Sequence, residues 1–84
     1  MTKQEVIDQL SPTLPEYTMF THSTVVRWTL PKNITISVGN VLLFVHYPNV
    51  DLSFPLELVH SIKFDLYKLR ITTDNSIDLA TILL

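Results

Sequence analysis

The chain has 84 residues, of which 46% are hydrophobic and 17% charged, and its net charge is −2. This length leaves room for one core, so we expect a single domain over residues 1–84. A composition rich in apolar and poor in charged residues is the opposite of the disordered signature. Six basic residues argue against a protein that binds mainly phosphates, and the absence of cysteine excludes disulfides and thiolate chemistry.

The sequence shows no sign of a membrane segment. No apolar run approaches the ~18 residues that a spanning helix needs. The amino-terminal stretch MTKQEVIDQL carries charges where a secretory signal would be apolar. We therefore expect a cytoplasmic protein that does not bind membranes.

The first segment, residues 1–11, is predicted to be a short helix. Thr2 can cap it, and Glu5 stands three residues later, as a capping box requires. The apolar positions that share one face of this helix are Val6, Ile7 and Leu10.

Residues 16–84 are predicted to form an antiparallel sheet. Between residues 16 and 30 apolar side chains alternate with polar ones, which is typical of a strand. The even positions of this run are Phe20, Val26, Trp28 and Leu30. The alternation places Trp28 in the core and Arg27 outside it.

The only glycine, Gly39, separates two apolar runs and precedes Asn40. Glycine in the first position of a two-residue loop predicts a type II′ hairpin turn. The register that follows sets Val38 opposite Val41, Ile36 opposite Leu43 and Ile34 opposite Val45. Leu42 and Phe44 then point to the other face of the hairpin.

Farther along, Pro55 lies within an alternating run, which predicts a strand at a sheet edge or its end. Residues 56–59 are predicted to form one helical or bent turn, and the apolar parity switches at Asp65 and Leu66, which indicates a tight turn. The run FPLELVHSIKFDLYKLRIT resembles, in its apolar spacing, the late strands of pleckstrin-homology-like and other small bent-sheet domains. We take no function from this resemblance.

The last segment, residues 76–84, is predicted to be a strand. A three-residue loop over residues 74–76 sets Ile71 opposite Leu79 and leaves Asp78 near Arg70. The alternative is a terminal helix capped by Asn75 or Ser76. The expected fold is therefore α+β and mainly β, with a short helix followed by a strongly bent antiparallel sheet or small barrel of five to seven strands.

Catalytic chemistry finds little support in the sequence. The three histidines, His22, His46 and His60, lack the short spacing of metal ligands, although Asp51 or Asp65 could join them if they converged. No serine or threonine lies in a glycine-flanked elbow, and no glycine-rich phosphate loop is present. We expect no enzyme activity, no metal and no cofactor.

One cluster of basic and aromatic residues suggests an alternative function. Its members are Lys63, Tyr67, Lys68 and Arg70. Cations beside an aromatic ring on a sheet are typical of proteins that bind single-stranded nucleic acid. Acidic residues nearby favour instead an ordinary solvated face.

The chain has more apolar faces than one interior needs. The side chains predicted to face a partner are Leu42, Phe44, Ile82 and Leu84. We expect the amino-terminal helix to cover most of the second face of the hairpin, and the last strand to remain an open edge that accepts a partner strand or a second copy. The predicted function is a small non-enzymatic protein-binding module, such as an accessory factor or a proteinaceous inhibitor of the phage or mobile-element type.

Overall fold

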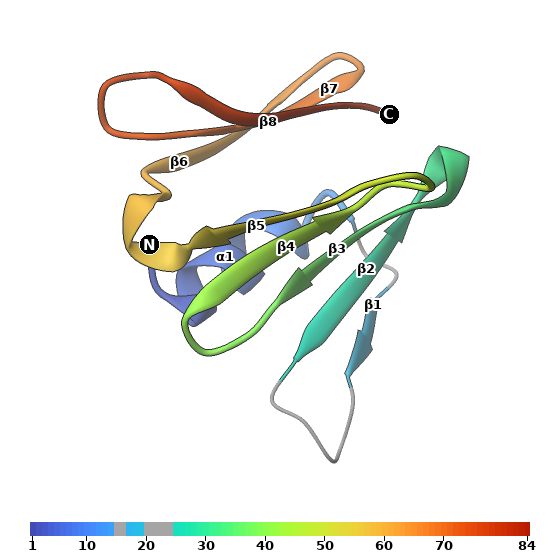
Figure 1. Cartoon of the computed structure of the whole chain (residues 1–84), viewed down its shortest axis with the longest axis horizontal. Helices are drawn as coiled ribbons and strands as arrows, with labels where there is room; N and C mark the ends of the chain where they lie inside the picture. The colour runs from blue at the N-terminus through green and yellow to red at the C-terminus, as the bar shows by residue number, and fades with distance from the viewer. Residues whose placement is uncertain (15–16, 20–24) are drawn as a thin grey trace.

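In the computed structural model of this chain, residues 1–14, 17–19 and 25–84 are described, the side chains of 17–19 excepted. Figure 1 shows helix α1 and the strands, which lie in two groups. The elements are α1 (Lys3–Leu10), β1 (Tyr17–Met19), β2 (Val26–Leu30), the 3-10 turn η1 (Pro31–Asn33), β3 (Ile34–Val38), β4 (Leu42–His46), β5 (Asp51–Pro55), the 3-10 turn η2 (Leu56–Leu58), β6 (Ser61–Asp65), β7 (Lys68–Thr72) and β8 (Asp78–Leu83). The predictions for Phe20 and His22 lie outside the described residues.

The strands form two separate antiparallel sheets. Sheet A has five strands in the order β1-β2-β3-β4-β5, and sheet B has three strands in the order β6-β7-β8. The prediction of a mainly β fold with one amino-terminal helix is confirmed. The prediction of one bent sheet or a closed barrel is wrong, because the chain leaves sheet A through η2 after Pro55 and starts a new ladder at Ser61.

The helix begins as the sequence predicts. The Glu5 backbone N–H donates to the Thr2 hydroxyl oxygen at 3.2 Å, and the Thr2 backbone N–H donates to Glu5 Oε1 at 3.1 Å. These two bonds complete a capping box around the otherwise unpaired first turn. Hydrogen bonds from Thr2, first from its backbone and then from its hydroxyl, hold the pKa of the Glu5 carboxyl below its ordinary value.

This cap predicts a pH dependence. Because the pKa of Glu5 is lower in the folded chain than in the unfolded chain, its contribution is present above about pH 4–5 and is lost as the pH falls through the lowered value. Urea unfolding should show the wild type more stable than Glu5→Gln at pH 6, with the difference shrinking at pH 3. A difference that stays constant with pH would contradict this role of the carboxylate.

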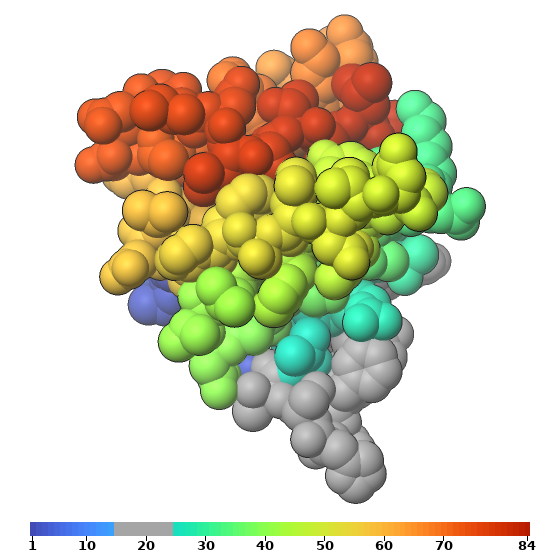
Figure 2. All heavy atoms as spheres, viewed as in Figure 1, coloured from blue at the N-terminus to red at the C-terminus, as the bar shows by residue number. Residues whose placement is uncertain are grey.

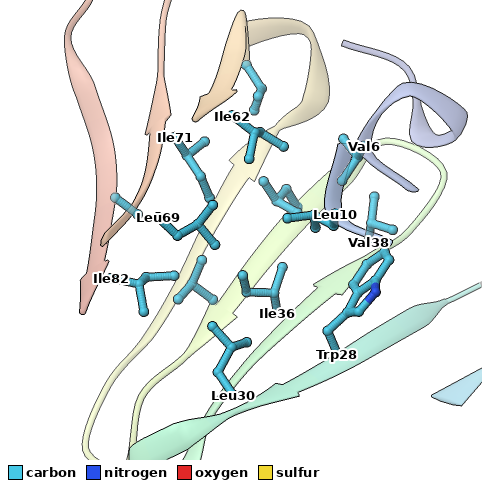
Figure 3. Packing of buried hydrophobic residues seen from close by; sticks show 14 of the residues in the cluster. Val6, Leu10, Trp28, Leu30, Ile36, Val38, Ile62, Leu69, Ile71 and Ile82 are labelled. Atoms are coloured by element: carbon cyan, nitrogen blue, oxygen red, sulfur yellow. The ribbon is translucent and has the colours of Figure 1, made fainter. Parts of the chain in front are cut away.

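The core lies between one face of sheet A and two covers, which are α1 and sheet B. Figure 3 shows side chains from all three parts meeting. The buried apolar residues of the core are Val6, Leu10, Val26, Trp28, Leu30, Ile34, Ile36, Val38, Leu43, Val45, Leu56, Val59, Ile62, Leu69, Ile71, Ala80 and Ile82. Trp28 is fully buried, so the prediction that it belongs to the core is confirmed.

The helix α1 packs on the same face of sheet A as sheet B does. Val6 and Leu10 join the same cluster as Ile36 and Leu43. Leu42 and Phe44 alternate with Leu43 and Val45 along β4 and so point to the opposite face. The prediction that α1 covers most of that second face is therefore wrong, because α1 has one apolar stripe and the core uses it.

The hairpin of β3 and β4 forms with a different register from the predicted one. Val38 lies opposite Leu43 and Ile36 opposite Val45. The Gly39 N–H donates to the Leu42 carbonyl at 2.9 Å, so the loop residues are Asn40 and Val41. Gly39 does not have a positive φ, which a type II′ turn would require of it, and the predicted turn is wrong. The shift is two residues, so the side chains of both strands stay on their predicted faces. Val41, predicted to lie opposite Val38 on the core face, lies in the loop and is 70% exposed.

Gly39 should consequently tolerate a side chain. A Cβ at this position would lie 3.7 Å from the Leu42 carbonyl oxygen, an ordinary contact. Gly39→Ala should stabilise the chain by about 0.4–1 kcal/mol, because it lowers the entropy of the unfolded state. Chemical denaturation measures this change. A matched control is Lys32→Gly, which should also stabilise, since Lys32 has φ 64°. If Gly39→Ala instead lowers the free energy of unfolding by more than about 1 kcal/mol, Gly39 has a positive φ and the turn is the type II′ turn predicted from the sequence.

Between sheet A and sheet B the sequence predictions hold. Pro55 is the last residue of β5, and β5 is an edge strand of sheet A. The predicted bent turn is η2, and the tight turn after Asp65 consists of Leu66 and Tyr67, with Asp65 opposite Lys68. The turn η2 leads the chain from sheet A to β6, and the turn at Leu66 and Tyr67 joins β6 to β7 within sheet B.

The last segment is the strand β8, so the alternative of a terminal helix is wrong. Ile71 lies opposite Ala80, not Leu79, and an irregularity between Ile71 and Thr72 sets Thr72 opposite Asp78. The predicted register is wrong because a bulge takes up Leu79. Arg70 Nη2 nevertheless donates to Asp78 Oδ1 at 2.7 Å, as the sequence predicts.

Candidate protein interface

The outer face of sheet A is the face directed away from the core. Figure 2 shows part of it over β3, β4 and β5 (green to yellow), with α1 almost hidden behind. The side chains on this face are Arg27, Thr29, Thr35, Ser37, Leu42, Phe44, His46, Asp51, Ser53 and Pro55. Two of the four predicted interface residues, Leu42 and Phe44, therefore lie on a face that α1 does not cover.

Polar neighbours surround Phe44. Its ring stacks on the His46 ring, with centroids 5.9 Å apart and planes 7° from parallel. His46 Nδ1 lies 3.0 Å from Asp51 Oδ1. Ser37 and Ser53 lie opposite Phe44 on the two neighbouring strands. Leu42 and Phe44 are both half-buried, so this face presents small apolar patches in a polar surface.

This placement predicts that a charge at position 44 is tolerated. Phe44→Asp should fold, with a loss of about 1–2 kcal/mol from the lost ring contacts and lower β propensity, because Phe44 lies outside the core. Circular dichroism and urea unfolding measure the outcome. A matched control is Val45→Asp, which buries a charge at a fully buried position and should unfold the chain. Unfolding of both variants would show that Phe44 is covered.

The other two predicted interface residues, Ile82 and Leu84, do not lie on an open surface. Ile82 is 1% exposed and belongs to the core, so its side chain does not reach the surface. Leu84 is half-buried against the core, and its N–H donates to the Tyr67 carbonyl at 2.7 Å. The side chains of β8 that face outward are instead Thr81 and Leu83, and Leu83 is 49% exposed.

The backbone of β8 offers hydrogen-bonding groups at a free edge. In an antiparallel ladder, residues alternate between directing their N–H and C=O to one neighbour and directing them away. Since Leu84 bonds to Tyr67, Ile82 and Ala80 also direct their backbone groups to β7. Thr81 and Leu83 direct theirs away from β7, and no other part of the described chain bonds to them.

The other sheet edges are protected. Edge strands that avoid pairing with other chains usually carry charges or proline. On β5 the residues with outward backbone groups include Asp51 and Pro55, and β6 carries Lys63 and Asp65. A very short edge strand also offers few groups for pairing, and β1 has three residues. The segment 79–83 of β8 has neither a charged residue nor a proline, so β8 is the least protected edge in the described part of the chain.

Exposed apolar residues lie at the same end of sheet B as Leu83. Leu66 is 99% exposed at the tip of the β6–β7 hairpin, beside Tyr67. The bond from Leu84 to Tyr67 ties this tip to the end of β8. Sequence reasoning missed Thr81, Leu83 and Leu66. The signal available was the uncharged stretch LATILL, which predicts an open edge but not which of its residues face outward.

The structure brings the basic residues of the alternative function to one place. Lys63 lies opposite Arg70 on the outer face of sheet B, and Lys68 Nζ lies 5.6 Å from the centre of the Tyr67 ring. Asp65 lies opposite Lys68, and Asp78 is bonded to Arg70. Three cations against two anions leave little net charge for phosphate binding.

The described residues hold no group of three or more His, Cys, Asp or Glu side chains placed to bind a metal ion. His46 pairs with Asp51, and His60 is exposed just before β6. A groove of about 630 Å³ lies between α1, the β3–β4 loop and η2, and Glu5 and Glu57 are among its lining residues. The Glu5 carboxylate accepts a hydrogen bond from the Thr2 backbone N–H in the helix cap, so Glu5 and Glu57 do not form a free pair of carboxylates in this groove.

Over the part of the chain that the structure describes, no helix is long and apolar enough to cross a membrane. Comparison with known proteins does not add an assignment. No family model matches this sequence, and neither a curated protein nor a solved structure matches it. The inference of function therefore depends on the surface of this chain alone.

Proposed function

We propose that this chain is a small non-enzymatic protein-binding module that pairs the free edge of β8 with a strand of another protein chain. The observation that carries the proposal is the contrast between β8 and the protected edges β5 and β6. An unprotected apolar edge invites aggregation unless a partner occupies it. Pairing by an added strand gains affinity from backbone hydrogen bonds and specificity from alternate side chains.

Thr81 and Leu83 provide both parts of this recognition. Their backbone groups point to the free edge, and their side chains lie on the outer face of sheet B. Leu66 and Tyr67 extend the apolar surface at the end of the strand. The low charge of the chain fits such a surface, which suits an accessory factor or an inhibitor.

The test compares two proline variants. Thr81→Pro removes an N–H that points to the free edge of β8, and the ladder with β7 does not use this N–H. Ser53→Pro is the matched control, since the N–H of Ser53 points to the free edge of β5. A proline at such positions is compatible with an edge strand, so both chains should fold.

We expect wild-type chain, used as bait in extract of its own organism, to enrich a partner protein at least about tenfold over Thr81→Pro, as loss of backbone bonds implies. Ser53→Pro should capture the partner as the wild type does. The purified partner should then bind wild type and Ser53→Pro with equal affinity. Equal capture by both variants and the wild type would exclude β8 as the binding edge. Binding of a single-stranded oligonucleotide at low salt, with no captured protein, would favour the basic cluster instead.

A further inference from the structure

We infer that the partner strand at β8 is β8 of a second copy of this chain, paired antiparallel about a twofold axis that passes through Ile82. This inference rests on the proposed function, because it names the occupant of the same edge. Three features of the chain support a second copy: the register that the free backbone groups permit, the side chains that this register brings together, and the charges on the competing edges.

The backbone of β8 allows few symmetric registers. A twofold axis perpendicular to the sheet keeps the core faces of both copies on the same side. Each residue must therefore lie opposite a residue whose side chain is on the same face of the sheet. Hydrogen bonds form only where two outward-directed residues oppose each other. Placing Thr81 opposite Leu83 of the second copy, and Leu83 opposite Thr81, meets both conditions.

This register uses every free group that the regular part of the strand offers. Each of the two opposed pairs exchanges an N–H···O bond in both directions, which gives four bonds in all. Centring the axis on Thr81 instead would give one regular pair and would oppose Leu83 to Leu79, where the bulge disturbs the ladder. The axis through Ile82 avoids the bulge.

The side chains that meet in this register are compatible. On the outer face, Thr81 and Leu83 lie opposite each other across the new pair, close enough for their side chains to pack. At the axis, the backbones of Ile82 and of Ile82 of the second copy oppose each other, while each Ile82 side chain stays in the core of its own chain. Charged side chains do not oppose each other in this stretch, so pairing does not bring like charges together.

Two symmetric registers at the competing edges are less favourable. Pairing β6 with itself about Lys63 would set two lysines opposite each other, which destabilises a ladder. Pairing β5 about Ser53 would oppose Asp51 to Pro55, which has no N–H to donate. The β8 register, in contrast to these two, opposes neither like charges nor a proline.

Pairing at the free edge of β8 would extend sheet B. Figure 1 and Figure 2 show β8 (red) at the same side of the molecule as the outer face of sheet A. Sheet B would continue as a six-stranded sheet, β6-β7-β8 and its symmetric counterpart, with the two cores on one side.

The first test measures association of the full chain. Analytical ultracentrifugation over a range of concentrations should show a monomer–dimer equilibrium for the wild type. Thr81→Pro removes one of the two bonds in each opposed pair and should raise the Kd at least about tenfold, whereas Ser53→Pro should leave it within about twofold. A wild type that stays monomeric up to about 1 mM, or a dimer whose Kd Thr81→Pro does not change, overturns the inference.

The second test needs no variant and decides the matter if Thr81→Pro fails to fold. In an equal mixture of isotope-labelled and unlabelled wild-type chain, a filtered NOE should connect the α protons of Ile82 in the two copies, since opposed residues that do not share hydrogen bonds have Cα atoms about 4.5 Å apart. The amide protons of Thr81 and Leu83 should exchange more slowly as the concentration rises. A dimer without the Ile82 NOE overturns the register and the inference.

The outcomes separate this inference from the proposed function. A monomeric chain that captures a different protein, with capture lost in Thr81→Pro, would refute the homodimer and keep β8 as a binding edge. A dimer formed elsewhere, together with capture that Thr81→Pro does not affect, would refute both.

Discussion

Ile82→Ala should destabilise the chain by about 2–5 kcal/mol, the usual cost of removing a buried isoleucine side chain down to its Cβ. Ile82 is 1% exposed and lies opposite Leu69 in the core of sheet B. Small domains have a free energy of unfolding of about 0.05–0.15 kcal/mol per residue, so this loss would be a large part of the total. Urea unfolding at several protein concentrations measures it and separates folding from association.

The matched control for this prediction is Leu83→Ala, one residue farther along β8. Leu83 is 49% exposed on the outer face, so the substitution should change stability by less than about 1 kcal/mol. The reverse order, with Leu83→Ala the more harmful change, would mean that β8 follows the register predicted from the sequence and that Ile82 faces outward.

Trp28→Ala should cost about 3–5 kcal/mol, because it removes the largest fully buried side chain of the core. Trp28 lies opposite Ile36 on β3, and its ring packs among side chains near α1 (Figure 3). Since Trp28 is the only tryptophan, its fluorescence reports this burial directly. The emission of the folded wild type should be shifted to shorter wavelengths and should move to longer wavelengths on unfolding.

Thr29→Ala provides the control on the neighbouring position. Thr29 is exposed on the outer face of sheet A, and its replacement should cost less than about 1 kcal/mol. A Trp28→Ala chain as stable as Thr29→Ala, together with solvent-like emission in the wild type, would place Trp28 at the surface and contradict the two-sheet core.

Local features of the fold were predictable. The capping box of Thr2 and Glu5 forms as expected because its two bonds span only three residues. The faces of β2, β3 and β4 were also predictable, since alternation assigns each side chain to a face without reference to the rest of the chain. The turn at Leu66 and Tyr67 was visible as a change of apolar parity.

The sequence predicts which face of a strand each side chain occupies, but not which residues lie opposite each other on neighbouring strands. At Gly39 the two-residue shift keeps the faces of the strand residues and moves only Val41 from the predicted core face into the exposed loop. The alternation of apolar residues therefore does not distinguish the two registers, and the turn is decided by how the strands meet. At β8 a bulge changes the parity itself. The sequence has no glycine there to mark the bulge, and the pairing of Thr72 with Asp78 depends on contacts across sheet B.

The candidate interface shows the same division. The sequence located an open edge in the last strand, and the tertiary structure decided that Thr81 and Leu83, not Ile82, face away from the core. It also left Leu42 and Phe44 half-buried on the outer face, because α1 can bury its single apolar stripe against only one face of sheet A.

The amino-acid sequence by itself determined the helix cap, the face of each early strand and the absence of charges along residues 79–84. These depend on backbone preferences and side-chain alternation over a few residues. Only the tertiary structure decided the division into two sheets, the face that α1 covers and the register of β8. Those outcomes depend on which apolar surfaces lose the most water when distant segments pack together, and no short stretch of the chain contains that information.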